Sequence, residues 1–159
     1  MPEFTHIDKQ GRVRMVDVTE KEPTLRVAVA QGIVSMNPDT FDKIMNQTIQ
    51  KGNVLETARI AGIMAAKKTS ELIPMCHPLN IKHIAIDFFP DKSKSTIKIE
   101  GAVRIIDQTG VEMEALTAVS IAGLTIYDMC KSYDRKMIIS DIYLIEKSGG
   151  KSGVFVRKK

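Results

Sequence analysis

The side chains best suited to proton transfer in this chain are an aspartate and a lysine three positions apart, Asp128 and Lys131. In a helix this spacing lets the two side chains touch. The simplest interpretation is a surface ion pair, which contributes about 0.3 kcal/mol. The alternative is acid–base chemistry, because a partly buried lysine beside a carboxylate has a perturbed pKa. Glu112 and Glu114 lie near the start of the same segment, where carboxylates also suit the positive end of a helix.

A second reactive pair, Cys76 and His77, lies between Pro74 and Pro78. Such a pair could ligate a metal or act as a nucleophile with its base. Adjacent residues rarely chelate one ion, and the sequence has no second cluster of cysteine and histidine, so no metal site is expected. His77 is expected either to donate a hydrogen bond to a ligand or to be an ordinary loop histidine.

A glycine-rich segment near the end of the sequence, residues 148–153, contains the run Gly-Gly-Lys-Ser. It is not a Walker motif, because Ile145 stands where the first glycine should be and no long helix can follow. Two interpretations remain. The segment is a frayed terminus, or its glycines and the lysines Lys147 and Lys151 gather around phosphate oxygens.

The composition is that of a globular protein, with 43% apolar and 26% charged residues and a net charge of +4. A disordered chain, a membrane span and a secretory signal are not expected, so the sequence predicts a cytoplasmic protein without membrane partners. Two cysteines are too few for a disulfide scaffold. The basic excess suits nucleic acid or a nucleotide triphosphate, but the low aromatic content of 5% disfavours a protein that stacks bases.

Apolar periodicity predicts the elements that position these residues. Helices are expected over residues 37–49, from Asn53 onward with a stripe of small residues, and over residues 112–131. Strands are expected in four segments with alternating apolar residues: 25–34, 84–88, 97–105 and 138–145.

The resulting order, strand, helices, strand, strand, helix, strand, is the βαββαβ order of ferredoxin-like folds. The sequence therefore predicts an α+β protein, with an antiparallel sheet and helices on one face. One domain is expected over residues 1–159, with a loosely structured segment at 1–24 and a flexible, glycine-rich, basic tail at 148–159.

The long helix carries two stripes. The first is apolar and the second is half apolar and contains Glu114, Leu124, Asp128 and Lys131. A helix that is apolar on two sides needs two covers. The sheet is one, and a second copy of the chain is expected to be the other.

Five blocks of the sequence closely resemble the MoaC family, the cyclic pyranopterin monophosphate synthases of molybdenum cofactor biosynthesis. The resemblance runs from the Met-Val-Asp-Val opening at Met15 to the glycine-rich tail, and one departure is Met75, where the family carries leucine. The blocks are residues 51–62, 74–79, 109–118, 124–131 and 147–153.

The resemblance implies a ferredoxin-like subunit in a hexamer, a trimer of dimers, with active sites at subunit interfaces. The substrate it implies is a cyclised dihydro-GTP, converted to cyclic pyranopterin monophosphate with loss of pyrophosphate. No tightly bound cofactor is implied, and Mg²⁺ bound with the substrate triphosphate is left open. Carried over by resemblance, the catalytic positions are Asp128, Lys131 and Lys51, and the substrate-binding positions are Met75, Cys76, His77, Met113, Glu114, Glu112, Arg26, Lys67 and Lys147.

Two other functions share this fold. An RNA-binding module would present stacking aromatic residues on its third strand, and residues 97–103 contain none. A ligand-sensing regulatory domain would need an effector domain, which this sequence does not supply. Turnover of the cyclised dihydro-GTP would separate both from an enzyme.

Overall fold

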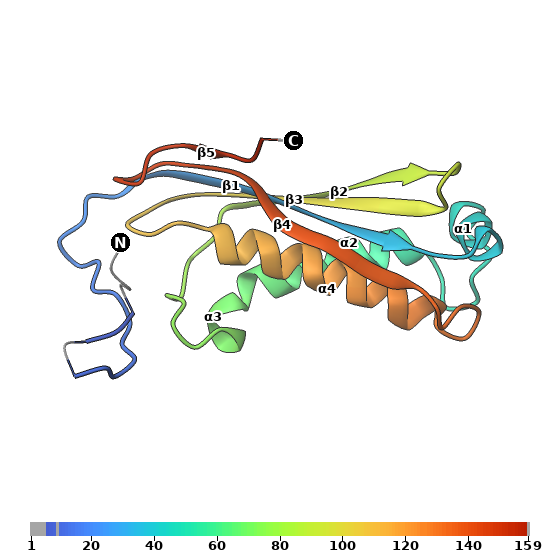
Figure 1. Ribbon diagram of the computed structural model, residues 1–159, viewed down its shortest axis with the longest axis horizontal. Coiled ribbons are helices and arrows are strands. Elements are labelled where there is room, and N and C mark those ends of the chain that lie inside the picture. Colours follow the sequence, from blue (N-terminus) through green and yellow to red (C-terminus); the bar gives the residue numbers. More distant parts are fainter. Residues whose placement is uncertain (1–5, 9, 159) are drawn as a thin grey trace.

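A computed structural model describes residues 6–8 and 10–158 of the chain, which form one five-stranded antiparallel sheet with helices on one face (Figure 1). The strands are β1 (Thr24–Ser35), β2 (His83–Asp91), β3 (Thr96–Asp107), β4 (Ile138–Ser148) and β5 (Phe155–Val156). The helices are α1 (Pro38–Met45), α2 (Val54–Lys67), α3 (Thr69–Leu72) and α4 (Glu112–Cys130).

The strand order is β2-β3-β1-β4-β5, and every pairing is antiparallel. Strand β1 is central and pairs with β3 along its whole length, from Thr24 opposite Asp107 to Ser35 opposite Thr96. Except for the short β5, this is the predicted βαββαβ arrangement. The predicted α+β, ferredoxin-like class is therefore confirmed.

Alternation along the strands separates the two faces of the sheet. Ala28, Ala30 and Val34 of β1, with Ile97 and Val103 of β3, are completely buried beneath the helices. Residues between them face the opposite side of the sheet, as a period of two requires. The core is therefore the single layer between the sheet and α2 and α4.

Helix α4 is covered on one side by the sheet and on another by α2 of the same chain. The two helices approach closely because Gly62 has no side chain. A Cβ there would lie 2.8 Å from the carbonyl oxygen of Ala118. By length and composition α4 could cross a membrane, as no other helix in the described part of the chain could. It packs instead as a core helix, with Val119 and Ile126 buried.

The expectation for the second stripe of α4 was therefore partly wrong. Glu114 was assigned to an outward stripe, but its side chain is only 3% exposed and lies inside the chain. Leu124, Asp128 and Lys131 do face outward. Helix α2 of the same chain covers part of this second stripe. The apolar pattern of α4 therefore does not by itself require a second copy of the chain.

Several element boundaries differ from the prediction, and the short helix α3 is not among the predicted elements. Helix α1 ends at Met45 because Gln47 adopts a left-handed conformation, with φ at 54°, and the amide of Thr48 donates back to the carbonyl of Lys43. Strand β4 continues to Ser148, and β5 was not predicted. It pairs with β4 through Phe155 and Lys147.

The N-terminal segment packs against the rest of the chain without forming a strand of the sheet. A bridge between Ile7 and Val13 closes a small turn, and the carbonyl of Val16 accepts a hydrogen bond from Nε2 of His77 at 2.8 Å. Of the predicted loose segment, residues 1–5 and 9 lie outside the described residues, as does Lys159 of the predicted tail.

Candidate active site

The three predicted catalytic residues meet at the C-terminal end of α4, in what we call the lysine cluster (Lys51, Asp128 and Lys131). The ammonium of Lys131 lies 2.7 Å from one carboxylate oxygen of Asp128, and that of Lys51 lies 3.7 Å from the other. Lys51 also donates to the backbone carbonyl of Asp128 at 2.9 Å, which satisfies one of the free carbonyls at the helix end. Asp128 therefore holds both lysines.

The lysine cluster is open to solvent, and its charged groups shift each other's pKa values. The hydrogen bond from Lys131 lowers the pKa of Asp128, and the same bond raises the pKa of Lys131. Both shifts favour an ionised aspartate and a protonated lysine. In the resting protein Lys131 can therefore donate a proton or stabilise negative charge, but it is not a free base.

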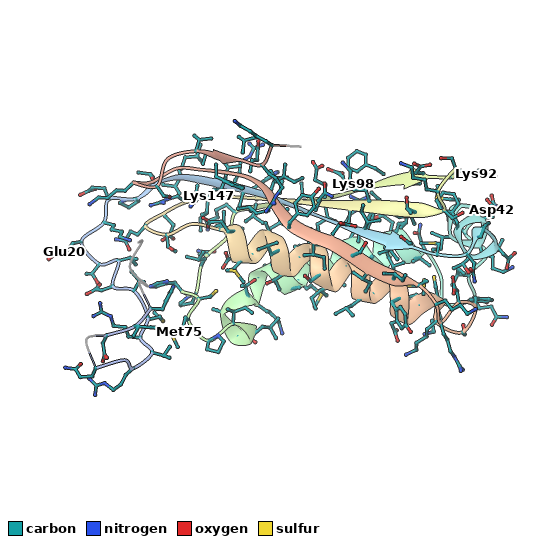
Figure 2. All side chains as sticks on the ribbon, in the orientation of Figure 1. Glu20, Asp42, Met75, Lys92, Lys98 and Lys147 are labelled. Atoms are coloured by element: carbon teal, nitrogen blue, oxygen red, sulfur yellow. The ribbon has the colours of Figure 1, made fainter. Side chains whose placement is uncertain are left out.

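A cavity of about 300 Å³ lies at the opposite end of α4 and is here called the base cavity. One wall is formed by the loop between Pro74 and Pro78, through Met75, Cys76 and His77. Another is formed by the first turn of α4, through Glu112, Met113 and Glu114. Figure 2 shows Met75 and Lys147 at this end of the molecule, and Asp42 and Lys92 at the other. The remaining lining residues are His6, Val16, Val18, Lys21, Leu79, Thr109 and Gly110.

Glu114 is the ionisable group most affected by its surroundings. Burial, with a smaller contribution from the charge of Glu112, raises its pKa to about 7. Burial and Glu114 together raise the pKa of the Cys76 thiol, and burial raises that of Cys130 to about 11. Neither cysteine is therefore the low-pKa thiolate that nucleophilic catalysis uses. Glu114 can accept hydrogen bonds from N–H groups of a ligand and exchange a proton near neutral pH.

A smaller, polar cavity of about 180 Å³, here called the phosphate cavity, adjoins the base cavity and shares Lys21, Thr109, Gly110 and Glu112 with it. Arg26 and Lys147 also line it. Lys147 contacts Glu112 at 2.9 Å and the hydroxyl of Ser152 at 3.0 Å, while the guanidinium of Arg26 donates to the carbonyls of residues 107 and 108.

Glycines make room for Arg26 beside this cavity. Gly149 has φ at 100°, and a Cβ there would lie 3.0 Å from Cδ of Arg26. The glycine-rich segment therefore lies against Arg26. A side chain at Gly149 would also overlap the backbone carbonyl of Leu25, which cannot move aside as the Arg26 side chain can.

The predicted site residues form two groups rather than one. Glu114 and Asp128 are fourteen positions apart on one straight helix, which corresponds to about 21 Å along its axis. The base and phosphate cavities thus lie at one end of α4, and the lysine cluster lies at the other. Lys67, in the last turn of α2, is exposed and lines none of these cavities.

Sequence reasoning missed the contribution of the N-terminal segment. His6, Val16, Val18 and Lys21 line the base cavity, although residues 1–24 read as loosely structured. Val16 and Val18 belong to the Met-Val-Asp-Val block that resembles the family, whereas His6 and Lys21 carry no sequence signal of their own. In the part of the chain that the structure describes, no three His, Cys, Asp or Glu side chains gather closely enough to hold a metal ion.

Comparison with known proteins assigns the chain to a family. The model of the MoaC family matches residues 15–150. The chain belongs to the MoaC family.

Curated relatives extend the likeness over the whole chain. A protein of Desulforapulum autotrophicum named cyclic pyranopterin monophosphate synthase is 63% identical over 156 residues, which is 98% of this chain and 96% of that protein. Proteins of the same name from Desulfatibacillum aliphaticivorans and Roseiflexus sp. are 62% and 58% identical. These alignments cover 99% and 98% of this chain, and 99% of each relative. The residues matched by the MoaC model include the lysine cluster, the loop residues 75–77 that line the base cavity, and Lys147.

Proposed function

We propose that this MoaC protein is a cyclic pyranopterin monophosphate synthase, which converts a cyclised dihydro-GTP to cyclic pyranopterin monophosphate and releases pyrophosphate. The observation that carries the proposal is the full-length identity of 55–63% to relatives that bear this name. The geometry adds a cavity with a buried carboxyl beside a cavity lined by cations, which suits a heterocyclic base joined to phosphates.

The proposed substrate lies with its base in the base cavity and its triphosphate in the phosphate cavity. Glu114 faces the ring's N–H groups, because a buried carboxyl is well suited to accept from them. Met75, Cys76 and Met113 contact the ring, and His77 presents its free ring nitrogen while Nε2 holds Val16. Arg26 and Lys147 bind phosphate oxygens, and the carboxylate of Glu112 holds Lys147 until the phosphates arrive.

The lysine cluster that serves this site belongs, in our proposal, to a second copy of the chain. Proton transfer needs a heavy-atom distance of about 3 Å, and within one chain the cluster is too far from the base cavity. A hexamer built as a trimer of dimers, with its sites at interfaces, removes this difficulty. Lys67, which lines neither the base cavity nor the phosphate cavity, is proposed to reach the phosphates of a neighbouring site.

Exposed apolar side chains on the helical layer support an interface. Ile60 and Met64 of α2, Leu72 of α3 and Leu124 of α4 are each more than half exposed. Large exposed apolar side chains on neighbouring helices are typical of a face that another protein covers. The second copy is the occupant we propose, because it is also needed to complete the site.

The chemistry requires proton transfers at the ring and ribose, and stabilisation of the leaving pyrophosphate. Lys131 is the proposed proton donor, since Asp128 keeps it charged. Lys51 is the second proton carrier, and Asp128 orients both lysines. Bound phosphates are neutralised by Arg26 and Lys147.

No tightly bound cofactor enters the proposal, and Mg²⁺ would arrive with the substrate's triphosphate. Glu112 is the carboxylate beside the phosphate cavity that could contact such an ion, once released from Lys147. A cytoplasmic location is proposed as well. Both cysteines are free thiols, as expected in a reducing compartment.

The test is turnover of the cyclised dihydro-GTP by the purified protein, with pyrophosphate and a pterin bearing a cyclic phosphate as the products to be detected. We expect both products in equal amounts. Formation of pyrophosphate without the cyclic phosphate, or no reaction with this substrate, would contradict the proposal.

A further inference from the structure

Lys21 is the one residue that lines the base cavity, the phosphate cavity and a third, wider cavity of about 720 Å³ beside it. It comes from the N-terminal segment, which contributes no strand to the sheet. Four residues line both the base cavity and the phosphate cavity, and Lys21 is the cation among them.

Hydrogen bonds in the N-terminal segment fix the position of the Lys21 backbone. The carboxylate of Asp17 accepts hydrogen bonds from the amide and hydroxyl of Thr19, at 2.9 and 2.7 Å, and the amide of Lys21 donates to the carbonyl of Val18 at 2.9 Å. Val16, just before this turn, is held by His77. Two successive turns thus place Lys21 at the entrance shared by the cavities, although its ammonium remains exposed.

The charges around the phosphate cavity are unbalanced. Lys21, Arg26 and Lys147 line it, against the single carboxylate of Glu112, which is paired with Lys147. Among the described residues no carboxylate lies within 4 Å of the ammonium of Lys21. Glu20 and Glu22 line the third cavity instead. The phosphate cavity therefore has an excess of positive charge, whereas the third cavity is mixed.

We propose that Lys21 is a substrate-binding residue that contacts the phosphates of the ligand, and that the N-terminal segment is thereby part of the active site. This inference rests on the proposed function, since it takes a polyphosphate with a heterocyclic base as the ligand. It commits the phosphates to the phosphate cavity and leaves the third cavity to solvent.

The test uses Lys21→Gln, which keeps most of the length of the side chain and removes its charge. A charge-assisted hydrogen bond contributes about 1.5–3 kcal/mol, so the KM for the cyclised dihydro-GTP should rise about tenfold or more. The kcat should change much less. Calorimetric binding of pyrophosphate to the resting enzyme should weaken by a similar factor, and Lys21→Arg should restore most of both.

The matched control is Lys92→Gln, which removes the same charge from a lysine at the far end of the molecule (Figure 2). It should leave KM and pyrophosphate binding unchanged. The slope of KM with ionic strength should fall for Lys21→Gln and not for the control, because one screened contact has been removed.

Three outcomes would overturn the inference. Unchanged KM and pyrophosphate affinity in Lys21→Gln would do so, as would an equal effect in Lys92→Gln. A loss of kcat and melting temperature that Lys21→Arg does not repair would assign Lys21 a purely structural role. Failure of the proposed function is separate. It would appear as no turnover by the wild-type protein, while the pyrophosphate measurement would still test Lys21.

Discussion

Lys131 is held as a cation by a carboxylate at 2.7 Å, and the resulting rise in its pKa limits the role that it can take. A donor of protons or of positive charge is consistent with this state, and a resting base is not. Asp128 is thus a positioning group for both lysines. Its backbone carbonyl accepts a hydrogen bond from Lys51 at 2.9 Å, and its carboxylate pairs with Lys131.

Replacing either lysine should abolish turnover without unfolding the protein. Lys51→Ala and Lys131→Ala each remove an exposed proton carrier and create no core cavity, so turnover should fall at least about a hundredfold while the melting temperature stays the same. Single-turnover kinetics and a thermal melt measure the two. Lys94→Ala, at an exposed turn between β2 and β3, is the control and should stay active. A variant of the cluster with normal turnover would remove that lysine from the mechanism.

Glu114 should make the protein less stable as pH rises towards neutrality. Its pKa is about 7 in the folded protein against an ordinary 4.5, so the folded state keeps a proton that the unfolded state has lost. Stability is therefore fully present below about pH 4.5 and is lost as pH rises through about 7. Urea unfolding across this interval measures the decline.

Glu114→Gln should remove most of that decline, because glutamine has no proton to lose. Glu71→Gln, at an exposed position on α3, should leave it in place. An identical pH dependence in Glu114→Gln and the wild type would mean that the Glu114 carboxyl is already ionised in the folded protein.

At the level of elements, α2 and α4 depend on the absence of side chains at their contact. Gly62→Ala gains about 1 kcal/mol of helix propensity but places a Cβ 2.8 Å from a backbone oxygen of α4. Overpacking costs about 1–3 kcal/mol, so we expect a net loss of stability in chemical denaturation.

The control substitution for this contact is at a glycine of α4. A Cβ on Gly123 would meet the methyl end of Ile139 at 3.2 Å, and a side chain can move where a backbone carbonyl cannot. Gly123→Ala should therefore be close to neutral. Equal destabilisation by the two substitutions would show that the contact between α2 and α4 is not the tight one.

The order of the elements could be predicted because each has a local signal. Asn53 caps α2 by accepting from the amide of Glu56 at 3.1 Å, and buried residues alternate along β1 and β3. The end of α1 could not be predicted from the sequence. Ile49 continues the apolar period and is buried, although the helix has already ended at Met45. Nor could β5 be predicted, since two residues have no period and their pairing depends on the length of β4.

The candidate site residues stay a prediction from periodicity and family resemblance, and the cavities that they line could not be predicted from either. Periodicity put Glu114 and Asp128 on one helix, and the family resemblance gave both a role. Their separation follows from that helix, but neither signal indicates which cavities lie at its N-terminal end. Likewise, Lys21 has no local pattern, because its importance comes from cavities built by residues far away in the sequence.

For the whole molecule, mixing inactive variants tests whether the site is shared between copies. Lys131→Ala mixed with Glu114→Ala, after subunit exchange, should recover about a quarter of wild-type activity, since each site draws its lysine cluster from one copy and its base cavity from another. Turnover before and after exchange measures the recovery.

The matched control combines Lys51→Ala with Lys131→Ala. Both lysines contact the same Asp128, so every copy in this mixture carries a damaged cluster and activity should stay absent. Recovery in the control, or none in the first mixture once exchange has been demonstrated, would contradict the shared site.

The distance along α4 between the base cavity and the lysine cluster also has a consequence for how activity depends on protein concentration. A site divided between two copies exists only where the copies are associated, so activity per subunit should decline on dilution below their dissociation constant. A substrate that touches both copies binds the assembled form alone and shifts the equilibrium toward it. If the proposed shared site is correct, bound substrate therefore stabilises the association of the copies, and assembly should be most complete when substrate is present.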